Sequence, residues 1–152
     1  MQTTRHAVFA VIAALLAFPL AMYALRPEIP AMPVEMLQKK ATHIAIGEVE
    51  RIYSTKERDG KWRVTRYVAE IRVEKTEKGE ALPTDEPVFV RWFSRSWSGG
   101  TPVADSNGHY GWTPKAGDDI RVYLAKNAHD GFHHDDFDGG LNVLVPNGFE
   151  KR

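Results

Sequence analysis

The sequence predicts an all-β fold, a small five-stranded antiparallel barrel that follows an N-terminal hydrophobic helix. Apolar residues recur at every second position in short runs after residue 43, which is typical of half-buried strands. Asp-Gly and other glycine-containing turns separate these runs, as in barrels with highly curved strands. The chain of 152 residues has room for one domain with a modest core.

The N-terminus predicts a membrane segment. Residues 7–25 carry no charge, and nineteen residues at helical rise match a hydrocarbon core of ~30 Å. We expect residues 1–25 to form a signal anchor or a signal peptide. The anchor is favoured, because no site has small residues at both −3 and −1. A buried core helix is the alternative, but so short a chain can hardly enclose it.

The flanking residues predict a membrane-anchored protein whose C-terminal domain is extracytoplasmic, in the periplasm or at the cell surface. A short basic tail with Arg5 precedes the apolar segment, as in export signals. Residues 26–33 contain three prolines and predict a stiff spacer. The barrel domain is then expected over residues 34–152.

The first half of this domain predicts a short helix and a hairpin. Pro33 at its start and lysines at its end favour a helix over residues 33–41. The run 43–53 reads as a strand with a bulge at Gly47, which would separate Ile44 and Ile46 from Val49 and Tyr53. Asp59-Gly60 predicts a tight turn. The return strand 62–75 would bury Tyr67, Ala69, Ile71 and Val73.

Three further strands are expected, over residues 88–94, 119–126 and 141–148. The long polar loop 95–118 and the hairpin tip 127–140 connect them. Loops on a rigid barrel are where recognition usually lies, so both are candidate contact surfaces.

The order of these elements resembles a known family. The runs "ATHIAIGEVERI", "VEKTEKG", "VFVRW" and "TPKAGDDIRVYLAK", followed by a glycine-rich hairpin, look like exported bacterial OB-like domains. These are related in outline to the netrin/tissue-inhibitor-of-metalloproteinase group, and the resemblance spans about residues 40–148. It implies only the barrel, because this chain lacks the cysteines that staple the animal inhibitors.

Charge and composition exclude some classes of function. Twenty basic and twenty acidic residues give no net charge, so the chain lacks the long-range field of a nucleic-acid binder. The absence of cysteine excludes a catalytic thiol and thiolate metal sites.

Aromatic rings alternate with guanidinium groups in the segment 91–97 and in the strand before it. On an OB-like sheet face this combination can stack on bases or sugar rings. The alternative is core packing with cation-π cover. Because export makes nucleic acid an unsuitable ligand, we expect a glycan or an unknown envelope protein as the partner. The candidate binding residues, which include three from the long loop, are Trp62, Arg66, Arg91, Trp97, His109 and Trp112.

The segment "GFHHDDFDGG" at 131–140 offers metal ligands. An alternative function is a calcium- or zinc-binding envelope protein that uses the 129–138 hairpin tip, with His133, Asp136 and Asp138 as ligands. The complete EF-hand pattern is missing, and a solvated turn explains the same residues. No other cofactor is expected.

A small hydrolase with its site in loop 95–118 is a further alternative. Ser94, Ser96, Ser98 and Ser106 lie near His109 in the sequence, but no nucleophile elbow or paired acid and base accompanies them. The sequence therefore predicts a membrane-tethered, extracytoplasmic binding module without catalytic activity.

Overall fold

A computed structural model describes residues 30–101, 108–126 and 140–152. The hydrophobic segment 7–25 and the first half of the spacer 26–33 lie outside the described residues. Within the described ranges, no helix has the length and hydropathy needed to cross a bilayer.

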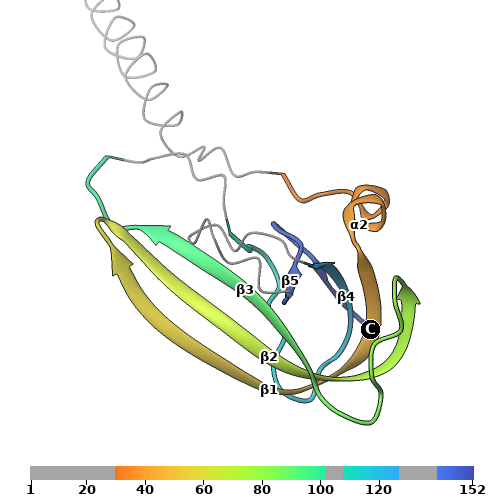
Figure 1. The fold of residues 1–152 in the computed structure, drawn as a ribbon. Helices are drawn as coiled ribbons and strands as arrows, with labels where there is room; N and C mark the ends of the chain where they lie inside the picture. Colours follow the sequence, from red (N-terminus) through yellow and green to blue (C-terminus); the bar gives the residue numbers. More distant parts are fainter. Residues whose placement is uncertain (1–29, 102–107, 127–139) are drawn as a thin grey trace, which may run out of the picture.

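The described chain is mostly β-structure with one short helix (Figure 1). The elements are α2 (Val34–Lys40), β1 (His43–Asp59), β2 (Trp62–Lys78), β3 (Val88–Trp97), β4 (Asp119–Lys126), β5 (Leu141–Val143) and β6 (Phe149–Lys151). The short helix predicted over residues 33–41 is confirmed, as α2. The four expected strands that precede residue 127 are all present.

Five strands close into a barrel. The hydrogen-bonded order is β1-β2-β3-β5-β4, and β4 pairs back onto β1 through residues His43 to Glu48. The prediction that all strands are antiparallel is wrong, because β3 and β5 run parallel, with Val90 opposite Leu141. A closed ring with an odd number of strands cannot alternate direction throughout, so one neighbouring pair has to be parallel.

The last expected strand, 141–148, is two short strands instead. β5 ends at Val143, and β6 begins at Phe149 and pairs with β4. Pro146 lies between them and has no N–H for a strand ladder. The Gly148 carbonyl still accepts a hydrogen bond from Tyr123 N at 2.9 Å.

The main core lies inside the barrel. Ala69, Ile71 and Val73 from β2 are at most 3% exposed, as the alternation in the sequence predicts. They pack with the inward residues of the other strands, namely Ala45, Val49, Val88, Val90, Trp92, Ile120, Val122, Leu124, Val143 and Phe149. A second cluster closes one end, where Leu37 of α2 packs with Ala41, Ile44 and Tyr123.

Irregular register in β1 sets which side chains face inward. The pairing with β2 shifts between Ile46 and Gly47 and again between Val49 and Arg51. A side chain at Gly47 would collide with the Arg72 carbonyl, so glycine is needed there. Because of the second shift, Tyr53 is 44% exposed although Val49 is fully buried, so the prediction that these two share a face is wrong.

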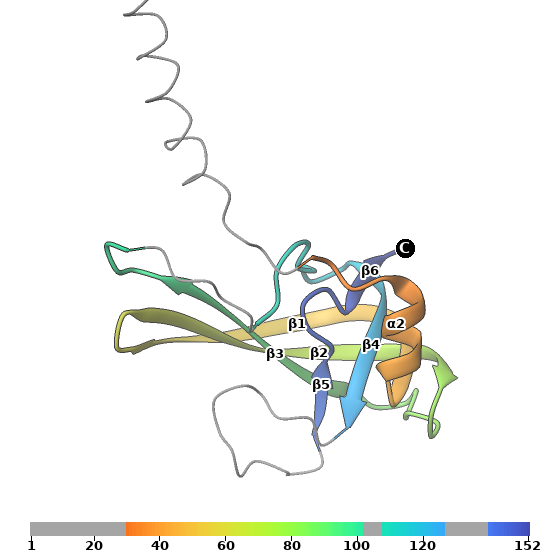
Figure 2. The ribbon, with the colours of Figure 1, turned by 90° about the horizontal axis from the view of Figure 1, so that it is seen from above.

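The far halves of β1, β2 and β3 extend beyond the barrel as a curved three-stranded sheet. We call residues 51–68 and 91–97 the arm; it projects away from α2 and β4 (Figure 2). Gly60 and Lys61 form the two-residue loop at its tip, and Gly60, the first loop residue, has φ 57°, which favours glycine.

Candidate functional site on the strand arm

The arm has two faces with different chemistry. Side chains alternate along each strand, and directly opposed residues share a face. One face continues the barrel interior, and we call it the inner face; its residues beyond the core are Ser54, Lys56, Arg58, Arg63, Thr65, Tyr67, Trp92, Ser94 and Ser96. The opposite, outer face carries Tyr53, Thr55, Glu57, Asp59, Trp62, Val64, Arg66, Val68, Arg91, Phe93, Arg95 and Trp97.

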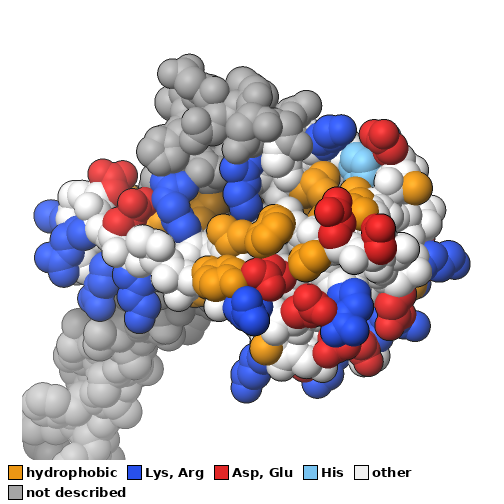
Figure 3. Space-filling view, turned by 60° about the horizontal axis from the view of Figure 1, so that its bottom comes forward, with side chains coloured by type: hydrophobic (Ala, Val, Ile, Leu, Met, Phe, Trp, Pro, Cys, Tyr) orange, Lys and Arg blue, Asp and Glu red, His pale blue; other side chains and the backbone are white. Residues whose placement is uncertain are grey.

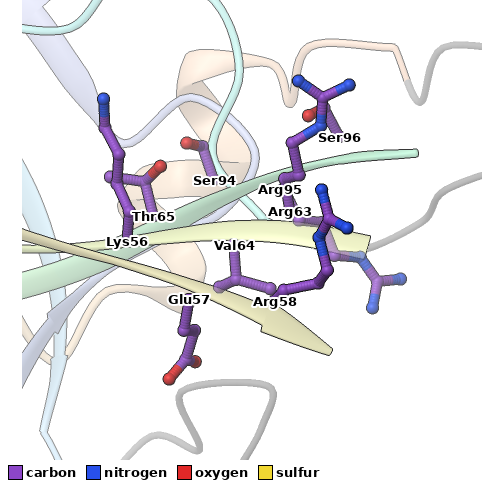
Figure 4. Close-up of a pocket in the computed structure, with 9 residues that line it drawn as sticks. All are labelled: Lys56, Glu57, Arg58, Arg63, Val64, Thr65, Ser94, Arg95 and Ser96. Atoms are coloured by element: carbon purple, nitrogen blue, oxygen red, sulfur yellow. The ribbon is translucent and has the colours of Figure 1, made fainter. Parts of the chain in front are cut away.

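A shallow hollow of about 560 Å³ lies on the arm. Its lining residues are Lys56, Glu57, Arg58, Arg63, Val64, Thr65, Ser94, Arg95 and Ser96. Figure 4 shows the side chains of Lys56, Thr65 and Ser94 on one side of the sheet and the Glu57 side chain on the other. We call the inner-face part of this hollow the cationic hollow.

Like charges are placed side by side in the cationic hollow. Arg58 lies directly opposite Arg63 in the β1–β2 register, and Lys56 lies opposite Thr65. All three cations are exposed. Like charges at directly opposed positions destabilise a sheet, so this arrangement is unfavourable for folding.

Several other cations of the described residues are paired with carboxylates. Arg72 Nη2 lies 2.6 Å from Glu50 Oε1, and Arg121 Nε lies 2.8 Å from Glu77 Oε2. Arg66 Nε on the outer face lies 2.8 Å from Glu57 Oε1, which directs that carboxylate away from the inner face. Among the described residues, no carboxylate forms an ion pair with Lys56, Arg58 or Arg63. The inner face of the arm therefore carries an uncompensated positive charge.

Hydroxyl groups flank these cations. Thr65 of β2 lies opposite Ser94 of β3, and Ser96 lies opposite Arg63. Hydroxyls and guanidinium groups both donate hydrogen bonds to anionic oxygens. The donor set suits a ligand with several carboxylates or other anionic groups.

Packed aromatic rings lie on the inner face between the cationic hollow and the barrel. Tyr67 and Trp92 stack with ring centroids 4.9 Å apart and planes 8° from parallel. Trp92 in turn meets Phe149 edge-on at 5.0 Å inside the barrel. The inner face of the arm is thus anchored on a rigid core rather than on a loop.

The structure brings four of the predicted binding residues together on the outer face. Trp62 lies opposite Trp97, with ring centroids 4.9 Å apart, and the Arg95 guanidinium lies 4.3 Å from the Trp62 ring centroid. Arg66 and Arg91 lie farther along the same face. Trp62, Arg66, Arg91 and Trp97 therefore share one face of the sheet, opposite to the cationic hollow.

The outer face is only partly accessible. Val64 and Phe93 in its middle are 1% and 5% exposed, and the Arg91 Nε atom is buried. Nearer the barrel, Tyr53 and Phe89 are 44% and 55% exposed. On the face that Figure 3 shows, hydrophobic side chains lie among positively and negatively charged side chains. This mixed surface has no concentrated charge, in contrast to the cationic hollow.

The other two predicted binding residues lie elsewhere. His109 is 4% exposed and packs edge-on against Phe149, so a partner cannot reach its ring. Its Nε2 atom lies 3.0 Å from the Trp112 carbonyl oxygen. Burial lowers the pKa of His109, and the bond to Trp112 offsets only part of that effect. Trp112 itself is 37% exposed.

The described residues form neither a metal site nor a hydrolase site of the kind that the sequence suggested. His133, Asp136 and Asp138 lie outside the described residues, as does Ser106. The part of the chain that the structure describes contains no group of three or more metal-ligating side chains. Ser98 donates its hydroxyl hydrogen bond to the Lys61 carbonyl at 2.6 Å, and His109 is buried away from solvent.

Sequence reasoning missed Lys56, Arg58 and Arg63 as a group. The Asp59-Gly60 signal locates the hairpin but not its register: the two-residue loop is Gly60-Lys61, one residue farther along, and this loop sets Arg58 opposite Arg63. No protein-family model matches the chain, and no curated protein or solved structure matches it significantly either.

Proposed function

We propose that the chain is a membrane-tethered, extracytoplasmic, OB-like binding module without catalytic activity. In this proposal, the cationic hollow on the arm binds an acidic protein partner. One observation carries it: Lys56, Arg58 and Arg63 are exposed together, none of them forms an ion pair with a carboxylate of the described residues, and two of them are directly opposed. Residues that break a local folding rule without a structural gain are expected at functional sites.

The barrel supports the OB-like assignment. An OB-fold is a five-stranded barrel that binds ligands on the face of its second and third strands and on the loop between its first and second strands. Here β2 and β3 supply Arg63, Thr65, Ser94 and Ser96, and the β1–β2 hairpin supplies Lys56 and Arg58. The hollow thus occupies the region that such folds use for binding.

The N-terminal sequence supports the tether and the compartment. The uncharged segment 7–25 is long enough to cross a bilayer, and Arg5 precedes it. A proline-containing spacer would hold the barrel away from the membrane. The resemblance to exported OB-like domains points in the same direction.

An acidic protein fits the hollow better than a glycan or nucleic acid. Exposed aromatic rings are what sugar rings need for stacking, but the rings on the same face as the cations, Tyr67 and Trp92, stack on each other. A chain without net charge lacks the long-range attraction for nucleic acid. Carboxylates on a protein surface match isolated, exposed arginines and a lysine.

Binding of a fluorescent polyglutamate peptide to the full chain tests the proposal. We expect affinity that falls as salt rises and is lost in the variant Lys56→Gln/Arg58→Gln/Arg63→Gln. A matched control, Lys39→Gln/Lys40→Gln/Lys151→Gln, removes the same charge from exposed positions elsewhere. Equal loss in both variants would contradict a specific site. Binding to an acidic glycan array but not to polyglutamate would assign the hollow to a glycan instead.

A further inference from the structure

The outer edge of β1 along the arm is an unpaired sheet edge. β4 covers β1 only from His43 to Glu48, and Val49 bonds with the turn before β4 through Val49 N to Asp118 O at 3.0 Å. From Glu50 to Asp59, β2 is the only described strand beside β1. The backbone groups on the other side of this segment have no described partner.

The hydrogen-bond pattern shows which residues present these groups. Ser98 N donates to Lys61 O at 2.8 Å, so odd-numbered residues of β2 point toward β3 and even-numbered ones toward β1. Trp62 lies opposite Asp59, and the alternation continues down the hairpin. Ile52, Ser54, Lys56 and Arg58 therefore direct their N–H and C=O groups outward.

The same residues place their side chains on the inner face. A strand added to this edge would set residues directly opposite Lys56 and Arg58, with side chains on the cationic hollow. Such opposed positions have Cβ atoms ~5 Å apart, which is within reach of an ion pair. The edge and the hollow thus form one continuous surface.

We propose that the acidic partner binds as an extended strand on the β1 edge, with acidic residues at alternate positions beside Lys56 and Arg58. This inference rests on the proposed function and specifies how the partner binds. The residue between the two acidic ones would lie on the outer face next to Glu57, so it is expected to be neutral or basic. Backbone hydrogen bonds supply affinity in such strand addition, and alternate side chains supply specificity.

A second copy of the chain does not fit this edge. Only outward-pointing residues can pair with each other, so antiparallel self-pairing aligns Lys56 with Arg58, or Lys56 with Lys56, or Lys56 with Ser54. The first two registers bring like charges together, and the third leaves the cations without carboxylates. Charged edges of this kind protect natural sheets from self-association.

Two nine-residue peptides with the same composition test the inference on the full chain. One alternates glutamate with threonine, and the other carries its glutamates in one contiguous block. We expect the alternating peptide to bind about tenfold more tightly. Ser54→Pro removes one outward N–H and keeps every cation, so it should weaken this peptide about fivefold. Arg63→Gln should weaken both peptides, and Lys151→Gln neither.

Hydrogen exchange gives a second measurement that needs no variant. The amides of Ser54, Lys56 and Arg58 should exchange about tenfold more slowly with the alternating peptide bound, while those of Thr55 and Glu57 should change little. Equal affinity for the two peptides, with sensitivity to Arg63→Gln but no amide protection, would overturn strand addition and leave the anion site in place. Binding that is insensitive to Arg63→Gln would overturn the proposed function itself.

Discussion

Replacing Arg63 with glutamate should stabilise the fold and abolish binding in the cationic hollow. Arg63 lies directly opposite Arg58, so the substitution exchanges a repulsive pair for an attractive one. Opposed charge pairs contribute ~0.2–1 kcal/mol, and like charges cost a similar amount. Both side chains are exposed, so we expect a net gain of ~1 kcal/mol at low salt.

Urea unfolding measures this gain. With a slope of ~2 kcal/mol per molar urea, the midpoint should rise by ~0.5 M, and about half of that should be reached by Arg63→Thr. The gain should shrink at high salt, because the pair is screened. The Arg63→Glu variant should no longer bind polyglutamate.

Arg72→Glu is the matched control on the same strand. Arg72 lies 2.6 Å from Glu50 and 3.8 Å from Glu48, so the substitution should destabilise the fold by ~0.5 kcal/mol, discounted because Arg72 is 59% exposed. The central expectation is that Arg63→Glu raises the free energy of unfolding and Arg72→Glu lowers it. If Arg63→Glu destabilised the fold as Arg72→Glu does, the idea that Arg63 is kept for binding at the expense of stability would be refuted.

Four further predictions concern the fold and the tether. Ile71→Ala should cost ~3 kcal/mol of unfolding free energy in urea titration, since Ile71 is 1% exposed in the barrel core; a cost under 1 kcal/mol would contradict the barrel packing. Gly47→Ala should prevent normal β1–β2 pairing, which circular dichroism and thermal unfolding would detect. Burial lowers the pKa of His109 in the folded state below its ordinary value of 6.5. The contribution of neutral His109 to the free energy of unfolding should therefore be complete above pH 6.5 and be lost as the pH falls through the folded-state pKa. The decline should be smaller in His109→Gln. Deletion of residues 1–25 should move the protein out of the membrane fraction; unchanged fractionation would argue against the tether.

The sequence predicted the barrel well because each strand carries its own signal. Alternation in β2 identified Ala69, Ile71 and Val73 as core, and Asp59-Gly60 located the hairpin. The parallel β3–β5 pair was not predicted, since strand direction follows from closing the ring and not from any local pattern. Likewise, β5 and β6 both pair with β4, and the break between them falls at Pro146, which the predicted strand 141–148 included.

The candidate site was harder to predict because it depends on register. Trp62 and Trp97 were found by their residue types, but their face is partly buried, as Val64 shows. Lys56, Arg58 and Arg63 look like ordinary charged residues of solvated strands when each is taken alone. The register shift after Val49 decides that Lys56 and Arg58 share the inner face, and no residue type marks such a shift.

The inner face changes character along the same three strands. Next to β4 and β5, the inner face carries the core residues Ala69 and Val90. Farther along the strands it carries the stacked Tyr67 and Trp92. At the tip of the arm it carries arginines. The change begins where no other described strand packs against this face, so solvation favours polar residues there. Solvation alone would be met best by mixed charges, which occur on the outer face as the Arg66–Glu57 pair. Two causes account for cations without acidic residues at this tip: protection of the β1 edge against self-association, and the acidic ligand that we propose.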